Sequence, residues 1–141
     1  MKPGFEYLDH TADLKFRSRG RTLGEAFENA GLALFTAITD LSKVEARTSR
    51  KLTLEAEELD MLLHDFLSEL IYLFSAEEML FSGFKVDILK IDTYQLHATV
   101  SGEKIDRKRH LLQKEVKAAT FHDMLIEQTP DGLVIEVVCD T

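Results

Sequence analysis

Apolar residues recur at helical spacing in two long segments of the chain. The first follows Thr22-Leu23-Gly24-Glu25, which has the form of a capping box: the Thr22 hydroxyl can accept a hydrogen bond from the Glu25 amide, and the Glu25 carboxylate can return to the Thr22 amide. Ser82-Gly83 is expected to end the second segment. Both patterns predict amphipathic helices, the second being the central core helix. The apolar positions are Leu23, Ala26, Phe27, Ala30, Leu34 and Ile38, then Leu59, Leu62, Leu63, Phe66, Leu67, Leu70, Ile71 and Phe74.

Alternation of apolar and polar residues predicts strands in much of the remaining chain. Two short strands flank the polar link Asp9-His10, and Gly20 closes the second of them. Residues 40–50 are polar and predict a loop before the next strand. Two later runs are joined around Asp92-Thr93, which predicts a β-hairpin. The alternating residues are Phe5 and Tyr7, Leu14 and Phe16, Leu52, Leu54 and Ala56, Phe84, Val86 and Ile88, and Tyr94, Leu96, Ala98 and Val100.

Residues 107–119 carry conflicting signals. Their Lys, Glu, Ala and Leu residues favour a helix, whereas Val116 and Ala118 also suit a strand. We predict a helix here.

The last part of the chain reads as a strand pair. A strand begins around Met124 and Ile126, and Pro130-Asp131-Gly132 makes a turn. The continuous apolar run over 133–138 predicts a strand buried on both faces, in a central sheet position. The expected fold class is therefore α+β: a single domain over residues 1–141, with a mixed or antiparallel β-sheet packed against two main helices.

Composition supports a globular protein. The 141 residues are 45% hydrophobic and 30% charged, which excludes a disordered chain. No apolar run reaches the ~18 residues that cross a membrane. The N-terminus lacks the apolar core of a secretion signal, because Glu6 and Asp9 come too early. The single cysteine, Cys139, rules out an internal disulfide. We expect a cytoplasmic protein that does not bind membranes.

The net charge of −8 is a poor basis for gripping phosphate backbones. Basic clusters occur at 47–51 and 107–110, and we interpret them as solvated surface. Any role in RNA metabolism is therefore expected to run through a protein partner, with tRNA contacted only indirectly.

Common catalytic and nucleotide-binding motifs are absent from the sequence, including GxGxxG, the Walker A loop, HExxH, paired cysteines and GxSxG. Cys139 lies between apolar strand residues and Asp140. A nearby carboxylate raises the pKa of a thiol and lowers its reactivity. We predict a buried structural thiol.

Carboxylates occur at two places that suit a cation. Asp9-His10-Thr11-Ala12-Asp13 crowds polar groups between two strands, although such a segment also makes an ordinary turn. Asp140 and the carboxylate of Thr141 follow directly on the last strand, where their mutual repulsion would be relieved by a divalent ion. Oxygen donors suit Ca²⁺, Mg²⁺ or Mn²⁺. A solvated terminus with screened charges is the alternative.

The histidines carry weaker signals. A lone histidine such as His122 is more often a structural hydrogen-bonding residue than a ligand or base, and Asp123 either orients its ring or belongs to a turn. His64 is expected to point away from the apolar stripe of its helix into solvent. His97 alternates outward on its strand and is also expected to be solvated.

Five motifs in register resemble the archease family over essentially the whole chain. One departure is visible, since the core helix of the family often carries Trp where this chain has Phe66. The matching segments are Asp9 to Asp13, Glu69 to Phe74, Gly102-Glu103 with Asp106 and Arg109-His110, Glu115 to His122, and Val138 to Thr141.

The resemblance implies an α+β fold and a divalent metal, Ca²⁺ first and Mg²⁺ or Mn²⁺ next, held by Asp13, Asp140 and Thr141. His10, Lys117 and His122 are expected neighbours of that site. The implied function is that of a non-catalytic accessory protein of the RtcB-type RNA ligase in tRNA splicing, which promotes guanylylation and multiple turnover of the ligase.

Besides a purely structural subunit of an oligomer, two alternatives stay open at this point. One is a chaperone-like modulator of a tRNA-modifying enzyme such as a tRNA methyltransferase. The other is a metal-dependent hydrolase with His122 as the base, although no motif places a second basic or nucleophilic group.

Overall fold

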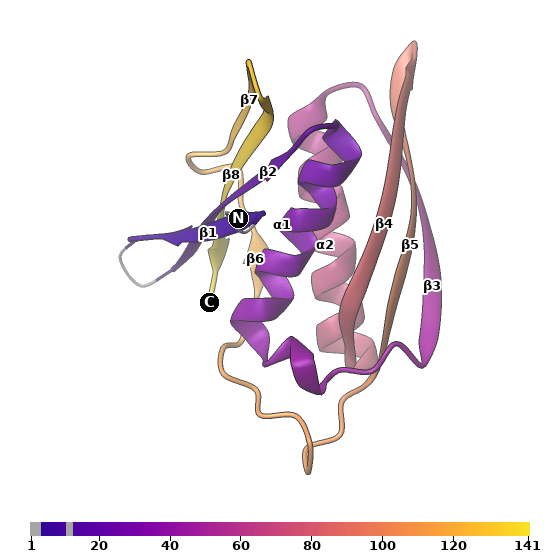
Figure 1. The fold of residues 1–141 in the computed structure, drawn as a ribbon, viewed down its shortest axis with the longest axis vertical. Coiled ribbons are helices and arrows are strands. Elements are labelled where there is room, and N and C mark those ends of the chain that lie inside the picture. Colours follow the sequence, from indigo (N-terminus) through magenta and orange to yellow (C-terminus); the bar gives the residue numbers. More distant parts are fainter. Residues whose placement is uncertain (1–3, 11–12) are drawn as a thin grey trace.

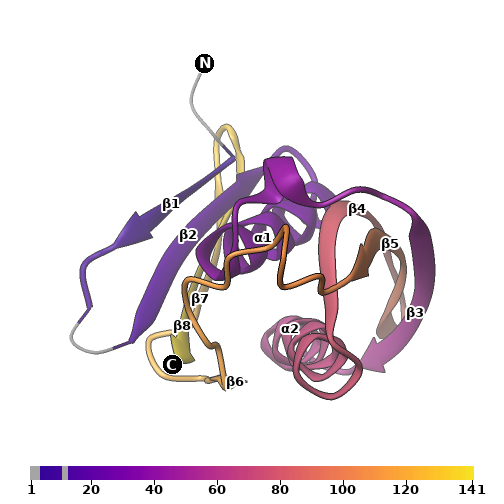
Figure 2. The same cartoon turned by 90° about the horizontal axis from the view of Figure 1, so that it is seen from below.

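The computed structural model describes residues 4–10 and 13–141 and contains two β-sheets with two helices between them (Figure 1). Seen from below, α1 and α2 lie side by side between the sheets (Figure 2). All strand pairs among the described residues are antiparallel. The expected α+β class is therefore confirmed, with antiparallel pairing.

The first sheet is built from both ends of the chain. It has five strands in the order β1-β2-β8-β6, and β7 also pairs with β8. β8 therefore has β2 on one side and both β6 and β7 on the other, which confirms its central position. The strands are β1 (Phe5–Leu8), β2 (Leu14–Gly20), β6 (Ala118–Ala119), β7 (Leu125–Thr129) and β8 (Gly132–Asp140).

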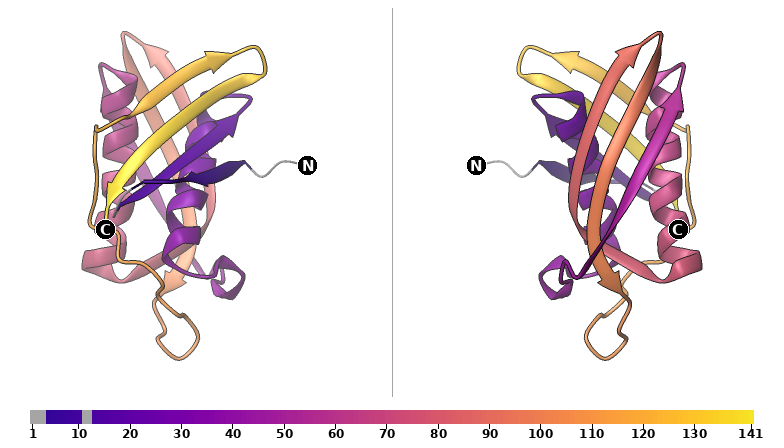
Figure 3. Two further views of the ribbon diagram at one scale, coloured as in Figure 1. Left: turned by 90° about the vertical axis from the view of Figure 1, so that its left-hand side faces the viewer. Right: turned by 90° about the vertical axis from the view of Figure 1, so that its right-hand side faces the viewer.

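The second sheet has three strands, in the order β3-β5-β4. These are β3 (Thr48–Ala56), β4 (Met79–Ile91) and β5 (Thr93–Lys104). The predicted hairpin is confirmed, and its tight turn is made by Asp92 with φ 62°. The loop predicted for 40–50 is shorter than expected, because a 3₁₀ turn at Leu41–Lys43 leads into a strand that already starts at Thr48. The two sheets are seen from opposite sides in Figure 3.

Helix α1 (Leu23–Ile38) begins at the predicted cap. The Glu25 amide donates to the Thr22 hydroxyl at 3.1 Å. The Glu25 carboxylate returns to the amide of Arg21 at 3.3 Å, one residue earlier than the capping box predicted. The first half of that prediction is confirmed and the second is displaced by one residue.

Helix α2 (Leu59–Glu77) is the predicted core helix, and its ring at Phe66 packs against Phe27 at 5.7 Å between centroids. The expected end at Ser82-Gly83 is wrong. Glu78 ends the helix in a left-handed conformation, and the chain enters β4 at once. Ser82 and Gly83 lie instead at a bulge inside β4. The physical reason is that Met79 to Phe81 are buried and pair with β5, which holds them in a strand.

The helix predicted over 107–119 is also wrong. The segment is a turn followed by irregular chain, and it ends in the short strand β6. Ala118 pairs with Asp140 in β6, so the strand alternative was correct for Ala118, whereas Val116 is buried but lies in irregular chain before the strand. The side chains of Arg109 and His110 form hydrogen bonds with the Glu103 carboxylate, and these contacts hold the start of this segment in a conformation that is not helical.

The core lies between the sheets, around the two helices. Its largest fully buried side chains include Phe16, Phe27, Phe35, Phe66 and Phe81. Within the described residues, neither helix is long and apolar enough to cross a membrane.

Candidate functional site: a carboxylate pair beside two histidines

The pairing of β2 with β8 brings the two ends of the chain together. Leu14 lies opposite Cys139 in an antiparallel pair. Asp13 directly precedes Leu14 and Asp140 directly follows Cys139, so the two aspartates lie at the same edge of the sheet. Leu14 and Cys139 point into the core, so the alternation of strand side chains turns the two aspartates to the outer face. The Thr11 and Ala12 part of the expected motif lies outside the described residues.

The two carboxylates also affect the buried thiol of Cys139. Burial raises the pKa of the Cys139 thiol to about 12, and the negative charges of Asp140 and Asp13 add to the increase. Both carboxylates therefore act on the same buried sulfur atom. The prediction of a buried structural thiol is confirmed, since Cys139 has no exposed surface.

The end of β8 is held by hydrogen bonds from the segment before it. The Lys117 amide donates to the Asp140 carbonyl at 2.8 Å, and Ala118 pairs with Asp140 in β6. Thr141 follows directly and is half-buried. Lys117 thus reaches Asp140 through its backbone, while its side chain is exposed. The strand end that carries Asp140 is therefore fixed in position.

His10 lies next to Asp13. Its Nδ1 atom is 3.7 Å from Asp13 Oδ2, and both side chains are partly buried. Asp13 also lines a surface hollow of about 330 Å³ between β1 and the end of α1, together with Lys114. A ligand from solvent or from a partner protein can therefore reach this carboxylate.

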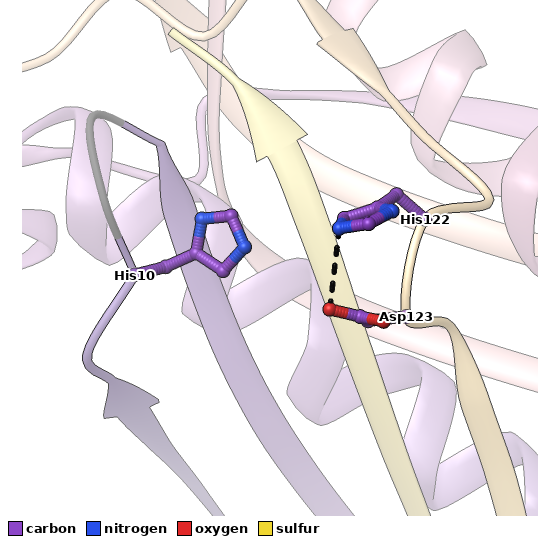
Figure 4. A group of neighbouring side chains, drawn as sticks. All are labelled: His10, His122 and Asp123. Carbon is purple, nitrogen blue, oxygen red and sulfur yellow. Dashed lines mark ion pairs between the residues drawn. The ribbon is translucent and has the colours of Figure 1, made fainter.

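His122 and Asp123 face His10 from the loop after β6 (Figure 4). The His122 Nε2 atom lies 3.3 Å from Asp123 Oδ2, and Asp123 is also a turn residue, so both sequence interpretations of Asp123 apply. The rings of His10 and His122 are 6.0 Å apart between centroids. Sequence reasoning placed His10 and His122 near the site but left Asp123 undecided, because its contact depends on a left-handed backbone at φ 53°.

His64 is the one histidine whose predicted solvation is wrong. Its ring stacks on Phe121 at 4.3 Å, and its Nε2 lies 3.1 Å from the Ala119 carbonyl oxygen. The side chain faces away from the helix core as expected, but β6 and the following loop cover it. His97 is exposed on β5, which confirms its prediction.

The motif that contains Glu103, Asp106 and Arg109-His110 stabilises the fold. The Glu103 side chain is buried and accepts hydrogen bonds from the Glu45 amide at 2.7 Å and from Arg109 at 2.6 Å, with His110 Nε2 at 3.2 Å. Burial alone would raise the pKa of Glu103. The Glu45 amide and the Arg109 guanidinium outweigh burial and hold that pKa at about 2. His110 accepts from the Asp106 amide through Nδ1, which leaves Nε2 as the protonated nitrogen.

This geometry defines a class of α+β proteins in which the two ends of the chain pair in one sheet and place two aspartates at its edge. The model of the Archease protein family matches residues 5–141. The archease of Methanosarcina barkeri is 44% identical over 138 residues, covering 96% of this chain and 94% of the relative. The chain belongs to the archease family.

Solved structures agree with that assignment. The solution structure of Methanobacterium thermoautotrophicum protein 1598 is 42% identical, covers 99% of this chain and 100% of its own, and superposes with a TM-score of 0.89. The crystal structure of a Thermotoga maritima archease, described as a possible chaperone, shares the fold at 21% identity and a TM-score of 0.63, covering 95% of this chain and 94% of its own.

Proposed function

We propose that this protein is a metal-binding accessory protein that activates an RtcB-type RNA ligase in tRNA splicing and RNA repair. It acts on the ligase and performs no catalysis of its own. It promotes guanylylation of the ligase, which allows each ligase molecule to complete many ligation cycles. The observation that carries this proposal is the pair of aspartates, Asp13 and Asp140, at one edge of the first sheet.

The residues present fit the implied metal. Two carboxylates at the same edge of the sheet repel each other, and a divalent cation would relieve that repulsion. Asp13, Asp140 and an oxygen of Thr141 form a donor set of hard oxygen atoms, which suits Ca²⁺ first and Mg²⁺ or Mn²⁺ next. The bound ion would supply a positive centre that orders the two strand ends.

The position of this donor set suits action on another protein. Asp140 is exposed, and Asp13 lines an open hollow rather than an enclosed active-site cavity. The net charge of −8 disfavours direct binding of RNA, so the protein is expected to meet tRNA only through the ligase. A cytoplasmic location is part of the proposal, since the single cysteine takes part in no disulfide.

Ligation assays with a cognate ligase test the proposal. The ligase is supplied with GTP, Mn²⁺ and excess RNA ends, and this protein is added at substoichiometric amounts. We expect a higher rate of ligase guanylylation and several ligation cycles per ligase molecule. Unchanged guanylylation and a single cycle, with an active ligase and folded metal-loaded protein, would refute it.

The same preparations test the alternatives. Recovery of a tRNA methyltransferase and no ligase in a pull-down would favour the chaperone-like modulator. Turnover of a phosphoester by the isolated protein would revive the hydrolase with His122 as base. The proposal predicts neither result.

A further inference from the structure

We propose that His10, His122 and Asp123 form a second metal site, which takes a divalent transition-metal ion such as Zn²⁺. This site lies beside the aspartate pair and is distinct from it. It requires no assumption about the ligase.

The three side chains converge from distant parts of the chain. One ligand atom from each residue lies within 4.8 Å of the other two. Donor atoms around a tetrahedral Zn²⁺ are about 3.3 Å apart, because each bond is about 2.0–2.1 Å long. His122 Nε2 and Asp123 Oδ2 are already 3.3 Å apart. A small movement of His10 towards this pair completes the geometry (Figure 4).

The loop that carries His122 and Asp123 is fixed to the body of the protein. Thr120 bonds the Val138 carbonyl through its amide at 3.1 Å and through its hydroxyl at 2.8 Å. The neighbouring Phe121 ring stacks on His64. The two ligands are therefore held near His10 before any ion binds, which reduces the entropy cost of forming the site.

His10 supplies a second, independent observation. Its Nδ1 atom is buried and has no hydrogen-bond partner among the described residues, although Asp13 Oδ2 lies 3.7 Å away. Histidines that bind metals commonly direct their other ring nitrogen at a carboxylate, which fixes the tautomer and orients the ring. With Nδ1 directed at Asp13, Nε2 of His10 is the nitrogen that binds the ion. Asp13 then acts as a positioning residue for this site.

The donor set selects the type of ion. Two imidazoles and one carboxylate suit Zn²⁺ and similar transition metals, whereas Ca²⁺ and Mg²⁺ prefer oxygen donors alone. Three protein ligands leave one coordination position open. His122 and Asp123 are 69% and 53% exposed, so that position faces solvent.

Zn²⁺ titration of the full, untagged chain tests the site. The titration is followed by competition with a chromophoric chelator, in the presence of saturating Ca²⁺. We expect one Zn²⁺ per chain, and at least a tenfold loss of affinity in His122→Ala and in Asp123→Asn. The matched control is His97→Ala, an exposed histidine on the other sheet, which should bind Zn²⁺ as the wild type does. Circular dichroism establishes that each variant is folded.

Equal Zn²⁺ affinity in the wild type and His122→Ala would overturn the proposal, as would displacement of Zn²⁺ by Ca²⁺. Asp140→Asn separates the two sites. It should keep the Zn²⁺ site while losing Ca²⁺ binding, and loss of both would show that there is one site only. Because ligase stimulation is not measured here, failure of this inference is distinguishable from failure of the proposed function.

Discussion

Leu14 and Cys139 are direct partners across the β2–β8 pair, with both side chains in the core. A one-residue slip of this register would turn every side chain of β8 to the opposite face. The buried pair thus fixes the positions of Asp13, which directly precedes Leu14, and of Asp140, which directly follows Cys139. Packing in the core and the geometry of the candidate site are in this way set by the same register.

Asp13 and Asp140 should both contribute to Ca²⁺ binding. Asp13→Asn and Asp140→Asn each remove one charged donor, and we expect at least about a tenfold loss of Ca²⁺ affinity in either variant. Without metal, both variants should be as stable as the wild type or slightly more stable, because like charges no longer repel. Calorimetric Ca²⁺ titration and thermal unfolding measure these effects. Asp131→Asn, in the β7–β8 turn, is the control, and a similar loss there would contradict the assignment.

Glu103 should make the protein sensitive to acid. Its ordinary pKa of 4.5 falls to about 2 in the folded state, so its stabilising contribution is complete above about pH 4.5. That contribution is lost as the pH falls from 4.5 towards 2. Glu103→Gln should lower the free energy of unfolding at neutral pH by about 3 kcal/mol, since it breaks a buried charge pair. Chemical unfolding at a series of pH values should show a shallower acid dependence for the variant, and parallel curves would refute this role.

Substitution by alanine at two glycines of the second sheet should have different effects on the free energy of unfolding. A Cβ atom at Gly102 would collide with the Leu80 carbonyl, a backbone group that cannot turn away. Gly102→Ala should therefore lower the free energy of unfolding by about 2 kcal/mol or more. Gly83→Ala is the matched control, because its Cβ would meet Ser101 at an ordinary 3.5 Å. Gly83→Ala should be neutral or stabilising by up to about 1 kcal/mol. Equal destabilisation of both variants in urea would be inconsistent with the described packing.

Cys139 should be inert in the folded protein. Its thiol pKa of about 12 leaves almost no thiolate at pH 8, and the residue has no exposed surface. Labelling with a thiol-specific disulfide reagent should be at least about a hundredfold slower in the native protein than in urea. Native labelling as fast as labelling of the unfolded chain would show that the end of β8 is open.

Local patterns in the sequence were enough to predict much of the fold. The stripe from Leu59 to Phe74 identified the core helix, and alternation identified the hairpin of the second sheet. The failures lie where tertiary contacts decide. The segment 107–119 has helix-forming residues, but Arg109 and His110 are held by Glu103, and Ala118 pairs with β8.

The candidate site could be predicted only in part. The carboxylates at 9–13 and at the end of the chain already suggested cation ligands, and the family resemblance joined Asp13, Asp140 and Thr141 into one set. The adjacency of Asp13 and Asp140 depends on a strand register between the two ends of the chain. The meeting of His10 with His122 and Asp123 depends on the same register and on the left-handed backbone of Asp123. Neither relationship leaves a local signal in the sequence.

The proposed function requires the aspartate pair for activation of an RNA ligase. The most direct test is multiple-turnover ligation by a cognate RtcB-type ligase, with GTP and Mn²⁺, in the presence of substoichiometric wild type, Asp140→Asn or the His97→Ala control. We expect strong acceleration by the wild type and the control, and little or none by Asp140→Asn, although all three are folded. Full acceleration by Asp140→Asn would show that the aspartate pair is not needed for activation.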